Sequence, residues 1–235
     1  MNSLLIHRNV TAFLQSLRDY VNHGYTYWTS GTIKTLKAEP LSVKFNERYG
    51  VLAPRQKRDY NRKLGRANSY LLMYPQVGGD IIDWILIATK GEGSVHCDEK
   101  LFSHHSGRHT ERIHWRHYEV VKMNGRLTWR LRPDVLIEWE KKIVSAARKK
   151  DIFDLQQVVN VLYHFPMFTG VRKQVWSLLQ KAYKTRQRHH HSDQVISRTL
   201  PIMKRIKIYD TPPNTLGKLV DAYRARLANY KFNNE

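Results

Sequence analysis

Apolar and β-branched residues gather in three runs near the middle of the chain. Residues 81–89 are nearly all apolar, which is typical of a strand buried on both faces. Residues 118–123 and 126–132 alternate apolar and polar side chains and are joined by Asn124-Gly125, the strongest short signal for a hairpin turn. We therefore expect an antiparallel hairpin beside a central buried strand.

The register of this hairpin follows from its two-residue turn. Val120 is expected opposite Trp129, on an apolar face, and Glu119 opposite Arg130, on the other face. A slip of one residue would bury the arginines, so the register is firmly specified. The second face is expected to be wet and basic, and it consists of Glu119, Thr128, Arg130 and Arg132.

The remaining pattern predicts two further strands and seven helices. Residues 25–29 and 69–74 are rich in aromatic and β-branched types, as strands are. We interpret the aromatic cluster in 25–29 as core packing rather than as a base-stacking platform. Helical periodicity, together with the favoured first-turn residue Pro40, predicts helices over 7–22, 40–48, 55–66, 134–149, 151–163, 169–188 and 216–230.

These elements indicate an α+β fold with a small, mostly antiparallel sheet of about five strands, covered by helices and followed by a C-terminal helical part. Basic and proline-containing sequence after residue 188 suggests a division. We expect an α+β nucleic-acid-binding core over residues 1–188, and a basic linker with a C-terminal helix over 189–235.

The net charge of the chain says most about its partner. Forty Lys and Arg against twenty Asp and Glu give a formal net charge of +20 and a pI of about 10.1. Such an excess repels itself in a compact chain, and a polyanion would offset that repulsion. Each neutralised phosphate also releases condensed counterions. Nucleic acid is therefore the expected partner, ahead of anionic lipid or no polyanion at all.

Several other classes are excluded or disfavoured by the composition. No apolar run approaches the roughly 20 residues that span a bilayer, and the N-terminus lacks a signal-peptide pattern. The single cysteine, Cys97, excludes an intrachain disulfide and a four-cysteine zinc site. We expect a cytoplasmic protein without a membrane partner.

The most basic stretch is residues 55–66, which carry six cations and almost nothing apolar. A helix that is polar all round has no packing reason to form within a domain. It is either a solvated arm or, as we prefer, a phosphate-binding helix or arm that orders on contact. Its expected phosphate contacts, with Tyr60 reaching toward bases, are Arg55, Lys57, Arg58, Arg62, Lys63 and Arg66.

Further arginines extend this expected track. Three lie in the long polar loop and two on the wet face of the hairpin, namely Arg108, Arg112, Arg116, Arg130 and Arg132. Phosphate contacts position a protein on nucleic acid, and base contacts, which the sequence does not assign, would specify a site.

Catalytic chemistry is not expected, although one alternative stays open. Six histidines lie in residues 96–117, but none of the paired spacings of structural zinc sites is present, so we expect no metal and no cofactor. The chain also lacks a phosphate-binding Gly-Lys-Ser/Thr loop and the clustered carboxylates of metal-dependent nucleases. A ribonuclease that uses a loop histidine is the enzyme alternative. Residues 151–163 and 169–188 leave a helix-turn-helix open, although their connection is long for it.

The stretch Trp84–Gly93, the run His117–Val120 and Thr128–Arg130 resemble basic accessory proteins of conjugative plasmids and integrative elements, the MobI-like mobilisation factors. The resemblance covers residues 30–180. It implies the DNA of a mobile element as the partner, favours DNA slightly over RNA, and carries over no catalytic residue. RNA binding or processing stays an alternative, as does a subunit of a larger nucleoprotein complex that docks through the stripe of 216–230.

Overall fold

The computed structural model describes residues 4–104, 111–191 and 214–232, together with 196, 199–202 and 206. It confirms an α+β fold with small antiparallel sheets and a C-terminal helix. The chain forms two compact units. Unit 1 comprises Met1–Ile113 with Arg205–Glu235, and unit 2 comprises His114–Lys204. The division expected at residue 188 rests on charge and proline content, and it stays a prediction.

The sheet of unit 1 has four antiparallel strands in the order β2-β3-β1-β4. β3 lies between two full-length strands and is buried along most of its length on both faces, as its apolar run predicts. Tyr25 and Trp28 of β1 are also buried, which confirms the core interpretation of the aromatic cluster. The strands are β1 (Tyr25–Lys34), β2 (Ser69–Pro75), β3 (Ile81–Thr89) and β4 (Phe102–Ser103).

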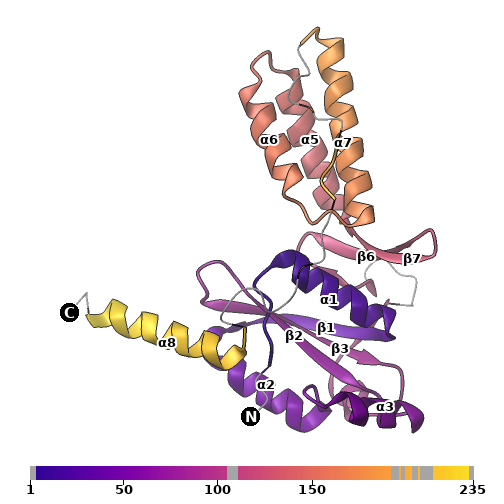
Figure 1. The fold of residues 1–235 in the computed structure, drawn as a ribbon, viewed down its shortest axis with the longest axis vertical. Helices are drawn as coiled ribbons and strands as arrows, with labels where there is room; N and C mark the ends of the chain where they lie inside the picture. Colours follow the sequence, from indigo (N-terminus) through magenta and orange to yellow (C-terminus); the bar gives the residue numbers. More distant parts are fainter. Residues whose placement is uncertain are drawn as a thin grey trace. The chain divides into compact units, whose positions relative to one another are not determined.

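Helices cover both faces of this sheet (Figure 1). Alternate residues of β3 join one core with α2 and the first turns of α8, while α1 lies across the sheet from α2. Asn9 caps α1 by accepting hydrogen bonds from the amides of Thr11 and Ala12 at 2.8 and 3.2 Å. The helices of unit 1 are α1 (Val10–Asn22), α2 (Thr35–Tyr49), α3 (Arg55–Lys63), α4 (Ser94–Asp98) and α8 (Leu216–Phe232).

The expected start of α2 at Pro40 is wrong, because the helix begins five residues earlier and Pro40 lies inside it. Thr35 explains the earlier start. Its amide donates to Asp80 O at 2.9 Å, and its hydroxyl donates to Gly79 O at 2.5 Å. These bonds fix the first turn of α2 on the β2–β3 connection. The helix therefore tolerates the loss of the backbone hydrogen bond that Pro40 cannot donate.

Unit 2 begins with a three-stranded antiparallel sheet in the order β5-β6-β7. The β6–β7 register is the predicted one, with Val120 opposite Trp129 and Glu119 opposite Arg130. Asn124 and Gly125 have φ of 49° and 77°, as a type I′ turn requires. The strands are β5 (His114–Trp115), β6 (Tyr118–Met123) and β7 (Arg126–Leu131). The five expected strands thus divide between two sheets, and two short strands join them.

Three helices follow this hairpin and pack on one another, and the N-terminus of α7 lies directly on β7 (Figure 1). Gly170 donates its amide to the Thr128 hydroxyl at 3.1 Å, and a Cβ on Gly170 would lie 2.3 Å from Trp129 O. The side-chain amide of Gln174 pairs with both backbone groups of Leu131, at 2.7 and 3.0 Å. The helices are α5 (Pro133–Arg148), α6 (Phe153–Tyr163) and α7 (Thr169–Arg188).

The expectation of a wet second face on the hairpin is therefore only partly correct. Glu119 and Thr128 are buried, whereas Arg130 and Arg132 are half-buried. Thr128 is buried because α7 docks on it, and a hairpin pattern alone does not reveal that contact. Within the part of the chain that the structure describes, no helix combines the length and apolarity needed to cross a membrane.

Candidate nucleic-acid interface

The basic helix α3 forms without an apolar face. It begins directly after Pro54, which has no side-chain cap bond to offer, and Leu64 beyond its last turn is exposed. Only one of its nine residues, Arg58, is buried, with 6% of its surface exposed. Hydrophobic packing therefore does not hold α3 on the domain. The contacts of Arg58 attach it instead.

Arg58 anchors α3 through its guanidinium group. Its Nε donates to Ala53 O and its Nη2 donates to Val51 O, both at 2.7 Å. Its Nη1 donates to the Tyr25 hydroxyl at 3.4 Å, and its guanidinium carbon lies 3.3 Å from the centroid of the Tyr70 ring. Planar stacking on an aromatic ring combined with forked hydrogen bonding is particular to arginine, so lysine would not replace it.

Three tyrosines from three elements surround this guanidinium group. Tyr20 of α1, Tyr25 of β1 and Tyr70 of β2 have ring centroids 4.1 to 5.7 Å apart. Burial raises the pKa of Tyr25, and the neighbouring Arg58 charge opposes that rise. Burial also raises the pKa of Tyr20, with smaller contributions from Tyr70. The hydroxyls of Tyr20 and Tyr25 therefore stay neutral at physiological pH, and the arginine charge is held by dipoles, backbone carbonyls and a ring face.

Two asparagines complete the attachment. Asn68 donates its side-chain amide to Arg58 O at 2.9 Å, and Asn61 donates to Asn68 Oδ1 at 3.1 Å. α3 thus confirms the predicted helix over residues 55–66, and these contacts order it without the partner contact that we expected to be needed. The assignment of Arg58 as a phosphate contact is corrected for the same reason, because its donors point into the domain.

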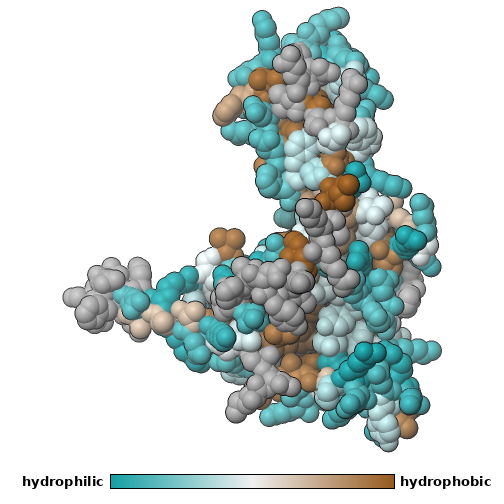
Figure 2. Space-filling view, viewed as in Figure 1, coloured by the Kyte–Doolittle hydropathy of each residue, from teal (hydrophilic) through white to brown (hydrophobic). Residues whose placement is uncertain are grey.

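The other cations of α3 and its C-terminal end are exposed, and they are Arg55, Lys57, Arg62, Lys63 and Arg66. Hydrophilic side chains cover this part of the surface (lower right in Figure 2).

One carboxylate, Asp59, lies among these cations. It approaches Arg55 and Arg62 at 3.6 and 3.9 Å, and all three side chains are more than half exposed. Such pairs are weak and leave the arginines able to bind another anion. Tyr60 is 59% exposed on the same helix, so a solvent-facing ring lies within the cationic surface.

The remaining predicted arginines lie outside α3, and three of them belong to unit 2. Arg108 lies outside the described residues, and Arg112 is half-buried in unit 1. Arg116 lies over the Trp115 ring, Arg130 pairs with Glu119 at 2.7 Å, and Arg132 pairs with Asp134 at 3.1 Å, all within unit 2. The continuous track expected from the sequence therefore stays a prediction, and the α3 set is the part that the structure assembles.

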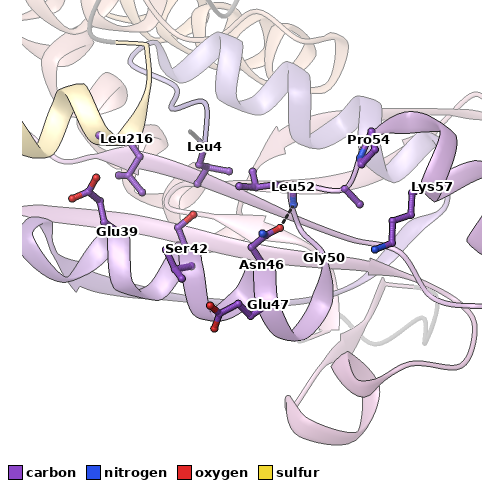
Figure 3. A pocket seen from close by; sticks show the side chains of 13 residues that line it. Leu4, Glu39, Ser42, Asn46, Glu47, Gly50, Leu52, Pro54, Lys57 and Leu216 are labelled. Atoms are coloured by element: carbon purple, nitrogen blue, oxygen red, sulfur yellow. Dashed lines mark hydrogen bonds between the residues drawn. The ribbon is translucent and has the colours of Figure 1, made fainter. Parts of the chain in front are cut away.

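A groove of about 740 Å³ lies beside α3, between α2 and the segment leading into α3 (Figure 3). Leu4 and Leu52 contribute apolar surface, while Glu39 and Glu47 line it from α2. Lys57 is the one basic residue among its lining. Two carboxylates disfavour a polyanion in this groove, so the exposed side of α3 is the more favourable surface for an anion.

The described histidines of the long loop have structural contacts. His96 Nε2 lies 2.9 Å from Thr89 O, and His104 Nδ1 accepts from the Ile113 amide at 3.2 Å. Across the described ranges, no group of three or more His, Cys, Asp or Glu side chains is placed to hold a metal ion. His105 and His109 lie outside those ranges.

Sequence reasoning missed the residues that attach α3, namely Tyr20, Tyr25, Asn68 and Tyr70. The available signal was α3 itself, since a polar helix that does form needs a polar anchor. Comparison of the chain with protein-family models, with curated proteins and with solved structures finds no match.

Proposed function

We propose that this protein binds nucleic acid through the exposed cations of α3, as an accessory protein acting on the DNA of a mobile genetic element. One observation carries the proposal. α3 has no packing reason to exist, yet Arg58 and three tyrosines hold it in place with five further cations facing solvent. An ordered cationic helix pays little conformational entropy when phosphates bind.

The charge of the whole chain supports a polyanionic partner. At +20 the protein repels itself, and every phosphate contact releases counterions to solution. Tyr60 adds an aromatic ring within the cationic surface, where it is available to contact a sugar or an unstacked base. The choice of mobile-element DNA rests on the resemblance of residues 30–180 described above.

The test removes charge from α3 without touching its anchor. We would compare binding of a duplex DNA of about 20 base pairs by the wild type, by the triple variant Arg55→Gln, Arg62→Gln, Lys63→Gln, and by a charge-matched control. The control, Lys37→Gln, Lys44→Gln, Lys218→Gln, changes three exposed lysines of α2 and α8.

The α3 variant is expected to lose affinity by on the order of 100-fold at low salt, and its salt slope should fall by about three, since each duplex contact contributes about 0.9. The control should stay within a few-fold of the wild type. Equal losses in both variants would show that α3 contributes only net charge, which contradicts the proposal. Cleavage of the DNA or of an RNA substrate would indicate the nuclease alternative instead.

A further inference from the structure

A second basic feature lies in unit 2, at the C-terminal ends of α5 and α7. A hollow of about 280 Å³ opens between these two helices. Its lining residues are Val144, Arg148, Lys181, Lys184, Thr185, Arg188 and His189. In sequence the α7 cations look like the approach to a linker, whereas the structure sets them against a cation of α5.

The hollow is built by close packing of two helices that begin at the same hairpin. Ala146, Ala147 and Ala182 are buried, which allows the helices to lie near each other. Arg186, with 1% of its surface exposed, donates Nη1 to Lys149 O at 3.0 Å and so ties the end of α5 to α7. This buried arginine fixes the walls, and the neighbouring arginines remain at the surface.

Four cations and no carboxylate are among the described residues that line the hollow. Lys181, Lys184 and Arg188 follow the helical spacing of one face of α7, and Arg148 comes from α5. Lys181 pairs with Glu140 at 2.5 Å. Among the described residues, no carboxylate lies within ion-pair distance of Arg148, Lys184 or Arg188. Three positive side chains therefore converge on a space that an anion would neutralise.

Attraction to the helix C-termini accounts for part of this arrangement, because Arg148, Arg186 and Arg188 all lie in last turns. Cations near the last turn are favoured by the helix dipole, and Arg186 satisfies that role directly by binding a terminal carbonyl. Lys181 and Lys184 lie before the last turn of α7, and they line the same space between the helices as Arg148 and Arg188. Unit 2 as a whole carries 18 Lys and Arg against 7 Asp and Glu, so its net charge is +11 within 91 residues.

We propose that this hollow is a second phosphate-binding site, filled by a backbone phosphate of the nucleic acid that α3 binds. An arginine from each helix offers forked donors to a phosphate, and Lys184 adds a compact charge. The protein then holds its partner through one cationic site on each compact unit. That the partner is a nucleic acid rests on the proposed function. That the hollow binds phosphate is argued from its own lining residues.

The test uses the full chain and two variants of α7. Lys184→Gln with Arg188→Gln removes charge from the hollow, and Arg172→Gln with Lys173→Gln removes equal charge from exposed positions near the start of the same helix. The salt dependence of duplex DNA binding is measured for each. The hollow variant is expected to lose affinity ten- to hundredfold at low salt, with a slope reduced by about two, and the control should remain within about threefold of the wild type.

Inorganic pyrophosphate serves as a probe that does not depend on nucleic-acid binding. At about ten times its dissociation constant it should raise the Tm of the wild type and of the control by about 3 °C, and leave the hollow variant unchanged. The melting temperatures without pyrophosphate report whether the variants fold.

The outcomes separate the two proposals. If duplex DNA binds and the hollow variant matches its control in both assays, the second site is overturned while the function proposed for α3 stands. If no nucleic acid binds but pyrophosphate protects through Lys184 and Arg188, the function fails and the phosphate site stands. Pyrophosphate protection that survives in the hollow variant, with an unchanged salt slope, places phosphate elsewhere and contradicts the site.

Discussion

α3 and the end of α7 are both short basic helical segments, but they are held in opposite ways. α7 has a complete apolar stripe, which is buried against its neighbours, and its cations occupy what the stripe leaves over. α3 has no such stripe, and its one buried residue, Arg58, attaches it to the domain. The cations of both segments are exposed, but those of α7 line a hollow together with Arg148 of α5.

The difference shows that charge and order are independent properties of a segment. Apolar periodicity explains why α7 is ordered and says nothing about where its cations converge. In α3 the absence of periodicity suggests a mobile arm, yet a guanidinium group stacked on Tyr70 and bound to two carbonyls replaces the missing apolar face. Arginines of α3 therefore differ in role by burial: Arg58 is buried and anchors the helix, whereas Arg55 and Arg62 are exposed.

The largest effect is expected from removing the anchor of α3. Arg58→Ala leaves the carbonyls of Val51 and Ala53 unpaired and should lower the free energy of unfolding by about 3 kcal/mol. It should also weaken duplex DNA binding by on the order of tenfold to 100-fold. This loss is expected although Arg58 is buried and is not one of the cations proposed to contact phosphate. Urea unfolding and DNA titration measure the two effects.

Arg62→Ala on the exposed side of α3 is the control for this anchor. It should change stability by no more than about 0.5 kcal/mol. Arg58→Lys should fail to restore the wild type, because an ammonium group lacks the planar fork. Wild-type stability in Arg58→Ala would sink the anchoring argument.

Acid is expected to lower the stability of unit 1, which carries α3, through a buried histidine that the described part of unit 2 lacks. His7 of unit 1 is the buried histidine among the described residues, its Nε2 lies 3.0 Å from the Ser16 hydroxyl, and burial lowers its pKa to about 4. Below about pH 6.5 the unfolded chain binds a proton that the folded chain refuses, so stability is complete above pH 6.5 and falls as the pH drops toward 4. The full loss from this group is about 3 kcal/mol.

Urea unfolding of the wild type and of His7→Gln between about pH 7.5 and 4.5 isolates this loss. Carboxylates titrate in both proteins, so the difference between the two curves belongs to His7. The two stability curves running parallel across this window would contradict a buried neutral histidine.

A smaller effect is expected where α7 meets the hairpin of unit 2. Gly170→Ala places a Cβ against Trp129 O, so α7 must shift away from β7. We expect a loss of about 2 kcal/mol in the free energy of unfolding. Ser177→Ala, at an exposed position of the same helix, should be neutral within about 0.5 kcal/mol. Equal urea midpoints for the two variants would show that the close approach of Gly170 is not needed.

The smallest effect should strengthen binding. Asp59→Asn removes the carboxylate from α3 and frees Arg55 and Arg62, so duplex affinity is expected to rise about three- to tenfold. Stability should change by less than about 0.5 kcal/mol, because both pairs are exposed and long. Asp221→Asn makes the same charge change on α8, and an equal gain there would attribute the effect to net charge alone.

Local signals predict much of this fold. Asn124-Gly125 with its alternating flanks gives the hairpin register residue by residue, and the apolar run of 81–89 gives the central strand. Periodicity gives the bounds of α7 directly. These features depend on neighbours in sequence, which is why a sequence contains them.

Other features depend on contacts between distant residues. The two-residue strands β4 and β5 have no periodicity to detect, and the start of α2 depends on Thr35 reaching Gly79. The α3 anchor joins residues 20, 25, 58 and 70, and the hollow joins cations more than thirty residues apart. The basic segments were visible from composition, but burial of Arg58 and convergence on the hollow required the tertiary structure.

The most direct test of the account is the binding of the unmodified protein to a DNA duplex, a single strand of equal length and an RNA hairpin over about 50 to 300 mM salt. The account predicts tightest binding to the DNA duplex, with log affinity falling against log salt at a slope of about −4.5 or steeper from the five exposed α3 cations. Absence of binding to all three, or binding indifferent to salt, would contradict it.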